Sequence, residues 1–156
     1  MMDWIEKSLS TLLNSKALKL FWEYFMLWST GGVIYYCIEM LWRGYSHPSM
    51  YTLGGICFIV LGLINQLYIT WNMKIWYQML IGAVLITLFE FITGCIVNIW
   101  LGWSIWDYSN MPFNICGQVC LLFTILWYFL SFVGIFLDDY LRWTIFGEDR
   151  PHYYLK

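Results

Sequence analysis

Apolar and polar positions divide the chain into four long apolar runs separated by short polar segments. Residues 48–73 include no charged side chain, and residues 75–106 include only Glu90. A helix needs about 20 mostly apolar residues to cross about 30 Å of hydrocarbon. The runs therefore predict an all-α polytopic membrane protein, a four-transmembrane-helix bundle with spans at about residues 20–42, 50–71, 75–100 and 115–137.

The first 19 residues show a helical periodicity instead of a continuous apolar run. The polar residues Lys7, Asn14 and Lys16 fall mainly away from the apolar positions, and Asp3 can cap the start of a helix. We predict an N-terminal amphipathic interfacial helix over residues 1–19, with a soluble extension of the first span as the alternative. Its apolar positions are Trp4, Ile5, Leu9, Leu12, Leu13 and Leu20.

Composition strengthens this interpretation and excludes several classes of site. Charged residues make up 12 % of the chain, against about 25 % in an ordinary soluble domain. The five cysteines form no CxxC pair, so we expect neither a disulfide framework nor a zinc site. Two histidines give little support for a haem, and a net charge of −2 does not suit nucleic acid. We predict no metal and no cofactor.

Lysine and arginine are distributed unequally between the two predicted sides of the membrane. Seven fall on the side of the termini and only Arg43 falls on the other, which predicts that both termini are cytoplasmic. We also predict that the chain lies in the plasma membrane. The transmembrane domain then covers residues 20–142 and a cytoplasmic tail covers residues 143–156. The seven residues are Lys7, Lys16, Lys19, Lys74, Arg142, Arg150 and Lys156.

Ionisable groups are costly inside a span, and two carboxyl groups within the predicted spans, Glu39 and Glu90, are candidate site residues. Glu90, Gly94 and Asn98 are four residues apart and share one helix face, with Thr93 beside them. This face either binds something or only holds helices together. Glu39 lies four residues before Arg43, which fits a local ion pair as well as a ligand-binding role.

The segment WDYSNMPFN (residues 106–114) places polar residues where the chain is otherwise apolar. Its turn formers and interfacial aromatic residues require no function. Asn114 and Gln118, however, are predicted to enter the fourth span on one face. We therefore predict a polar pocket in the outer half of the bundle, formed by Glu39, Glu90, Asn98, Asp107, Tyr108, Asn114 and Gln118, with Arg43, His47, Thr93 and Trp106 in secondary positions.

Other residues in the spans are better explained by packing than by chemistry. We expect Asn65 and Gln66 to form hydrogen bonds between helices. The glycine pairs at residues 31–32 and 54–55, and Gly94, are expected to allow close contact between helices.

These motifs resemble a bacterial membrane family grouped as type IV ABC-transporter permeases, with which small eukaryotic transmembrane proteins are also grouped. The similarity lies in WDYSNMPFNICGQVCL, the preceding FEFITGCIVNIWLGW and the following LWYFLSFVGIFLDDYL, and it extends over residues 20–151. The segment RGYSHPSMYTLGGICF departs from the commoner form of the family after the first span, so a function known for that form need not transfer.

The resemblance implies a transport subunit that works with partners. The chain has no GxxxxGK[ST] phosphate-binding loop, so a separate ATPase would have to meet its cytoplasmic ends at residues such as Lys74 and Arg142. Four spans are few for a transporter, so a homo-oligomer is the other expected assembly, in contact with membrane lipids. Two alternatives stay open: an intramembrane enzyme that acts on a lipid or isoprenoid through Glu90 or Asp107, and a non-catalytic scaffold or sensor.

Overall fold

The computed structural model describes residues 2–66 and 73–154, with side chains from residue 14 onward. Four helices dominate it: α1 (Met2–Arg43), α2 (Pro48–Gln66), α3 (Ile75–Gly94) and α4 (Leu121–Leu141). Two of them continue into π-helical turns, α3 into η1 (Cys95–Trp100) and α4 into η2 (Arg142–Phe146). A short antiparallel hairpin of β1 (Asn114–Ile115) and β2 (Val119–Cys120) precedes α4.

Three of the helical segments in the described residues are long and apolar enough to cross a membrane. They are Pro48–Gln66, Ile75–Trp100 and Leu121–Phe146. The prediction of an all-helical membrane protein is therefore confirmed. The prediction of a fourth span, over residues 20–42 of α1, is left open by this criterion of length and composition.

Helix α1 is one continuous helix of 42 residues. The boundary predicted near residue 19 does not interrupt it. The side chains that carry the predicted amphipathic pattern, from Trp4 to Leu13, lie outside the described residues, as do residues 67–71 of the predicted second span. The interfacial position of residues 1–19 thus stays a prediction.

The predicted start of the fourth span at residue 115 is wrong, because the chain forms a tight turn there. Cys116 and Gly117 have φ angles of 52° and 68°, and the Gln118 N–H donates to the Ile115 carbonyl over 3.0 Å. Positive φ at both central positions is the geometry of a type I′ turn, which joins antiparallel strands and not turns of a helix. The helix begins only at Leu121 and extends past residue 137 to Phe146.

The expected close contact between helices is confirmed for α1 and α2. A Cβ atom on Gly31 would collide with Phe58 and with the Gly54 carbonyl, and one on Gly54 would collide with Tyr35 and the Gly31 carbonyl. The two backbones therefore approach each other where neither has a side chain. Without water to drive association in lipid, small residues let such helices pack.

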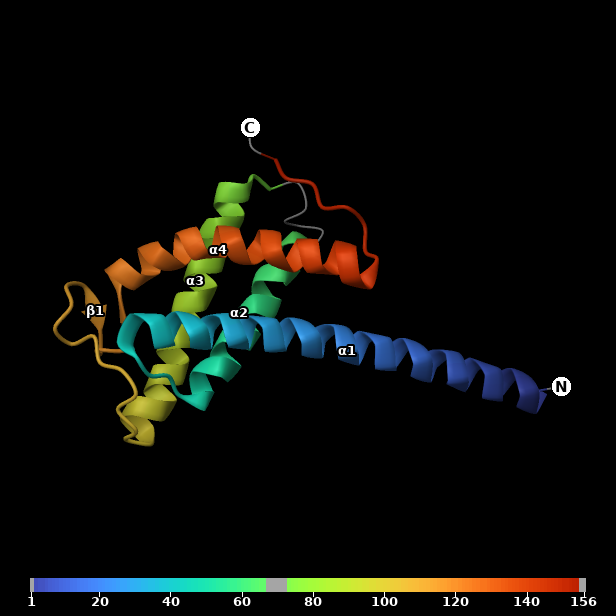
Figure 1. The fold of residues 1–156 in the computed structure, drawn as a ribbon, viewed down its shortest axis with the longest axis horizontal. Coiled ribbons are helices and arrows are strands. Elements are labelled where there is room, and N and C mark those ends of the chain that lie inside the picture. The colour runs from blue at the N-terminus through green and yellow to red at the C-terminus, as the bar shows by residue number, and fades with distance from the viewer. Residues whose placement is uncertain (1, 67–72, 155–156) are drawn as a thin grey trace.

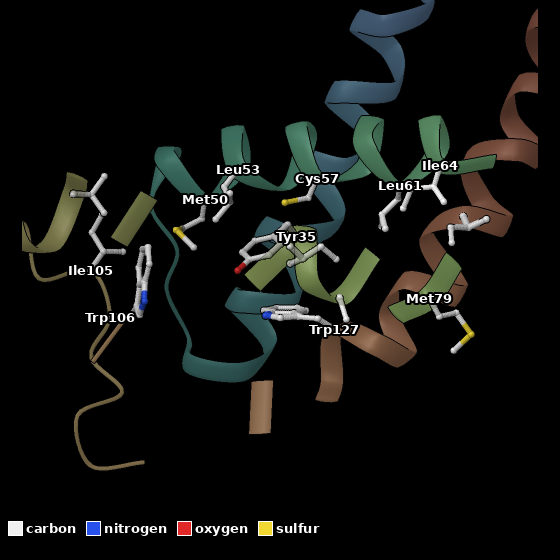
Figure 2. Packing of buried hydrophobic residues seen from close by; sticks show 14 of the residues in the cluster. Tyr35, Met50, Leu53, Cys57, Leu61, Ile64, Met79, Ile105, Trp106 and Trp127 are labelled. Atoms are coloured by element: carbon white, nitrogen blue, oxygen red, sulfur yellow. The ribbon is translucent and has the colours of Figure 1, made fainter. Parts of the chain in front are cut away.

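Helix α2 is the central element of the bundle, because it packs against α1, α3 and α4. Figure 1 shows α1 and α4 running in opposite directions across the view, while α2 and α3 slant across them. In Figure 2 the side chains of α2, such as Met50, Cys57 and Leu61, point toward Tyr35 of α1 and Trp127 of α4, in the buried core.

The C-terminal segment folds back onto the bundle. The Ile75 N–H donates to the Tyr154 carbonyl over 3.0 Å, and the rings of Phe136 and Tyr153 stack with their centroids 4.0 Å apart. This contact defines one end of the bundle, which we call the tail end (residues 147–154). The opposite end, with residues 101–120, is the loop end.

Candidate functional site

A cavity of about 650 Å³ lies between α1 and α4 at the loop end. Five residues of the predicted pocket line it: Glu39, Arg43, Trp106, Asp107 and Tyr108. Most of the rest of its wall is apolar or aromatic. The other lining residues are Tyr35, Ile38, Trp42, Tyr45, Phe123, Leu126, Trp127, Phe129, Leu130 and Val133.

Aromatic rings form a continuous wall from α1 to α4. The edge of Trp42 meets Phe123 with centroids 6.4 Å apart and an interplanar angle of 84°. Phe123 stacks on Tyr108 at 4.7 Å, and Tyr35 stacks on Trp127 at 5.8 Å. Such contacts fix the rings, since aromatic pairs prefer these offset and edge-on geometries.

A smaller cavity of about 60 Å³ continues this space toward the tail end. It shares Tyr35, Ile38, Trp127, Leu130 and Val133 with the larger cavity, and its lining is apolar. We call the two cavities together the α1–α4 groove. The groove is thus polar at its loop end and hydrocarbon-like along its depth.

Glu90 lies behind the groove wall and does not line the groove. Its side chain is 1 % exposed, and it accepts hydrogen bonds from the Trp127 indole N–H (2.8 Å) and the Tyr108 hydroxyl (3.2 Å). Neither donor carries a charge, and no described Lys, Arg or His side chain forms an ion pair with it. Glu90 therefore holds two aromatic side chains of the wall in place.

The rim at the loop end contains the expected ion pair between Glu39 and Arg43. The Arg43 guanidinium donates to Glu39 over 2.6 Å, which confirms the local pairing, and the Ser46 hydroxyl donates to the other carboxylate oxygen. Arg43 also donates to the carbonyls of Ile105 (2.9 Å) and Tyr45 (3.2 Å). All three of its nitrogens are thus used within the protein.

Asp107 and Tyr108 both lie at this rim, but Asp107 is charged and Tyr108 is neutral. Asp107 is exposed, and hydrogen bonds from the hydroxyl and N–H of Ser109 lower the pKa of its carboxyl, so it stays ionised at neutral pH. Burial, and secondly the nearby carboxyl of Glu90, raise the pKa of Tyr108 well above its ordinary value. Tyr108 is therefore a neutral donor.

Asn98 and Gln118 hold the loop in place and do not face the groove. The Asn98 amide donates to Gln118 (2.8 Å) and to the Trp106 carbonyl (3.0 Å), and accepts from the Ile105 N–H (2.7 Å). The Trp106 indole N–H in turn donates to the Gln118 carbonyl. Gly94 leaves the space for this network, because a Cβ there would collide with Gln118.

The prediction that Asn114 and Gln118 share a helix face is wrong, since both lie in the hairpin. The Asn114 amide donates to the carbonyls of Ser109 and Met111 and accepts from the Gly117 N–H, which stabilises the turn. His47 also has a local role, because its ring accepts from the Ser49 N–H at the start of α2. Thr93 is half-buried on α3 and does not line the groove.

A second polar cluster, at the tail end, was missed by the sequence analysis. Arg142 is 2 % exposed and donates to Asp138 (2.6 Å), to Glu23 of α1 (2.8 Å) and to Glu148 (3.3 Å). Its guanidinium also lies over the ring of Tyr24. This network joins α1 to α4 directly, at the end of the bundle away from the large cavity.

Neighbouring amides extend this cluster. The Asn65 amide donates to Asp139 over 2.7 Å, which confirms the expected hydrogen bond between helices, and the Tyr153 hydroxyl donates to the same carboxylate oxygen. The Gln66 amide donates to Glu148, beyond the end of η2. The tail is therefore tied to the bundle by side chains as well as by its backbone.

Arg142 was expected to meet an ATPase, and its burial contradicts that role. The available signals were Asp138 and Arg142, which stand four residues apart, and Glu23, an acid in an apolar run. Sequence spacing could indicate the pair within α4. It could not indicate that α1 supplies the second carboxylate, because 119 residues separate Glu23 from Arg142.

A comparison with protein families found one match. The model of a family described as "Putative ABC-transporter type IV" matches residues 23–145, which is most of the chain. The chain belongs to this family. The comparison with curated proteins found no match, and neither did the comparison with solved structures. In this member of the type IV family, the matched region includes both the α1–α4 groove and Arg142.

Replacing Glu90 tests whether it holds the aromatic wall. Glu90→Leu leaves the Tyr108 hydroxyl and the Trp127 indole N–H without an acceptor, whereas Glu90→Gln keeps one. A buried donor without a partner costs about 1–3 kcal/mol. We expect E90L to be less stable than E90Q by about 2 kcal/mol in thermal unfolding of the detergent-solubilised protein. Adding Tyr108→Phe to E90L should restore part of the loss, and equal stability of the two single variants would contradict this role.

Replacing Arg142 tests the cluster at the tail end. Arg142→Met leaves the buried carboxylates of Glu23 and Asp138 without a cation, which we expect to cost about 3–5 kcal/mol. The combined variant Glu23→Gln/Asp138→Asn/Arg142→Met removes the charges together and should recover most of this stability. The exposed Arg150, changed to Met, is the matched control. If R142M melts at the same temperature as R150M, the cluster does not hold α1 to α4.

Proposed function

We propose that this chain is a transport-associated membrane subunit of an ABC-type permease and that the α1–α4 groove holds an amphipathic molecule. The observation that carries the proposal is the groove itself, which combines a charged rim with an aromatic wall and an apolar depth. Family membership gives the transport context. A ligand with a polar head and an apolar chain fits both parts of the groove at once.

The groove is open sideways, between two helices. The side chains of Trp42, Phe129 and Val133 line it and are 75 %, 62 % and 54 % exposed. In a bilayer these surfaces meet lipid tails, so an amphipathic molecule can enter from the membrane without crossing water. This is the entry route that we propose for the substrate.

The proposed membrane arrangement has four spans, with residues 20–42 of α1 as the first. Both termini are cytoplasmic and the chain lies in the plasma membrane, so the rim of the groove faces outward. The asymmetry of Lys and Arg supports this orientation. The continuous helix α1 supports the first span, because a 42-residue helix is longer than one crossing requires.

A separate ATPase subunit is part of the proposal, because the sequence has no phosphate-binding loop of the GxxxxGK[ST] type. Arg150 is an exposed cation at the tail end, and Lys74 is half-buried there. These two residues take the contact role that the buried Arg142 cannot have. A homo-oligomer is the alternative assembly.

The enzyme alternative has less support from the site. Glu90 is sealed behind Tyr108 and Trp127, so a substrate in the groove cannot reach its carboxyl. Asp107 stays ionised, which suits a general base but not a general acid. A scaffold would not need the groove, and this favours transport over a scaffold.

Extraction of the tagged chain with its surrounding lipid, followed by native mass spectrometry, tests the transport proposal. We expect a co-purifying subunit that has a phosphate-binding loop, and a retained amphipathic molecule. Val133→Trp fills the groove and should abolish retention, whereas Val84→Trp, at an exposed position of α3 outside the groove, should not. If no such ATPase co-purifies and both variants carry the same small molecules, the proposal is wrong.

Thiol labelling of intact cells tests the membrane arrangement. The exposed Cys116 at the hairpin tip should react with a membrane-impermeant maleimide from outside, and Cys116→Gly should remove this signal. In the C116G background, Asn14→Cys and Asp149→Cys should react only after the cells are permeabilised. Reaction of N14C from outside would show that α1 does not cross the membrane.

A further inference from the structure

We infer that the head group accepted by the α1–α4 groove is a positively charged ammonium, so that the ligand is a cationic amphiphile. This inference rests on the proposed function, because it takes the groove to be a binding site, and it adds the charge of the ligand. It depends on the charges at the rim, on which of them are already paired, and on the rings that surround them.

The loop end has almost no positive charge. Arg43 is the only Lys or Arg between Lys19 and Lys74, and none occurs between Lys74 and Arg142. Two acidic residues, Glu39 and Asp107, line the rim beside Arg43. The rim therefore has a formal charge of −1, before the buried Glu90 behind the wall is counted.

The single cation of the rim is already paired with a carboxylate of the protein. Arg43 directs its three nitrogens to Glu39 and to the carbonyls of Ile105 and Tyr45, and its guanidinium lies over the Tyr45 ring at 4.6 Å. These contacts use three of its five N–H groups, and Glu39 already compensates its charge, so a phosphate or sulfate head meets a cation that is paired and partly engaged. Anionic amphiphiles are therefore poorly suited to this rim.

Asp107 is the group that remains for a ligand. In the described part of the chain, no Lys, Arg or His lies within ion-pair distance of its carboxylate. The N–H and the hydroxyl of Ser109 both donate to one carboxylate oxygen of Asp107, Oδ1. A lowered pKa keeps the group ionised, and it lines the cavity next to Trp106 and Tyr108.

The aromatic residues at the rim favour the same head group. Trp42, Trp106 and Tyr108 line the cavity at its charged end. The faces of such rings attract ammonium groups, and quaternary ammonium ligands are commonly held in aromatic cages. An ammonium can thus be placed against rings and the Asp107 carboxylate, while its chain lies along Ile38, Leu130 and Val133 in the groove.

Equilibrium binding of two matched probes tests this inference on the full chain in a neutral maltoside detergent. The probes are radiolabelled dodecyltrimethylammonium and radiolabelled dodecyl sulfate, which share a chain and differ in the charge of the head. Specific binding is the part that Val133→Trp abolishes and Val84→Trp leaves in place. We expect the ammonium probe to bind about tenfold more tightly than the sulfate probe.

Variants of the rim separate charge from structure. Asp107→Asn keeps an oxygen acceptor for Ser109 but removes the charge, so it should weaken ammonium binding about tenfold and strengthen sulfate binding, if it changes it at all. Asp149→Asn, an exposed acid at the tail end, is the matched control and should change neither. Preserved ammonium preference in D107N would overturn the role of Asp107 in the inference.

The outcomes distinguish the inference from the proposed function. If both probes bind equally, or the sulfate probe binds more tightly, and V133W removes the binding, then the groove binds amphiphiles and only the ammonium inference is wrong. If neither probe shows binding that depends on Val133, the groove is not a binding site and the proposed function fails with it.

Discussion

The ion pairs of Arg142 determine how the first and the last long helix, α1 and α4, are arranged. Its guanidinium is buried between Glu23 of α1 and Asp138 of α4, and it joins these helices at the tail end. At the loop end the same helices are separated by a cavity and meet through aromatic rings. A buried cation with carboxylate partners is costly to separate, so the tail end is a strong contact between α1 and α4. The larger cavity of the groove lies between the same helices at the end away from this ionic contact.

Polar residues at the loop end differ in how much of their hydrogen-bonding capacity is used within the protein. Glu90, Asn98 and Gln118 use their hydrogen-bonding groups to hold the wall and the loop, which is what buried polar groups in a membrane protein must do. Asp107 uses only part of its capacity on its own turn and stays exposed. The chemistry of the site therefore depends on the Asp107 carboxylate. Glu90, Asn98 and Gln118 serve to hold the wall and the loop around it.

Features that depend on short distances along the chain could be predicted from the sequence. The Glu39–Arg43 pair follows from a spacing of four, and the glycines at 31 and 54 indicated a close helix contact. The hairpin before α4 was missed because Asn114 and Gln118 were assigned to a helix face, although Gly117 already signalled a turn. The rim of the groove was predictable in part, but its apolar depth was not, since apolar walls look like any lipid-facing helix surface until α1 and α4 are placed together. The contact between Glu23 and Arg142 required the complete fold.

The link between Glu23 and Arg142 also has a consequence for how the protein is made. Glu23 of α1 is synthesised well before the arginine that pairs with it, because 119 residues separate Glu23 from Arg142. An incomplete chain that ends before Arg142 has no guanidinium to pair with Glu23. The ionic contact that joins α1 to α4 therefore forms late in biogenesis, whereas the close contact of α1 with α2 needs only the first part of the chain.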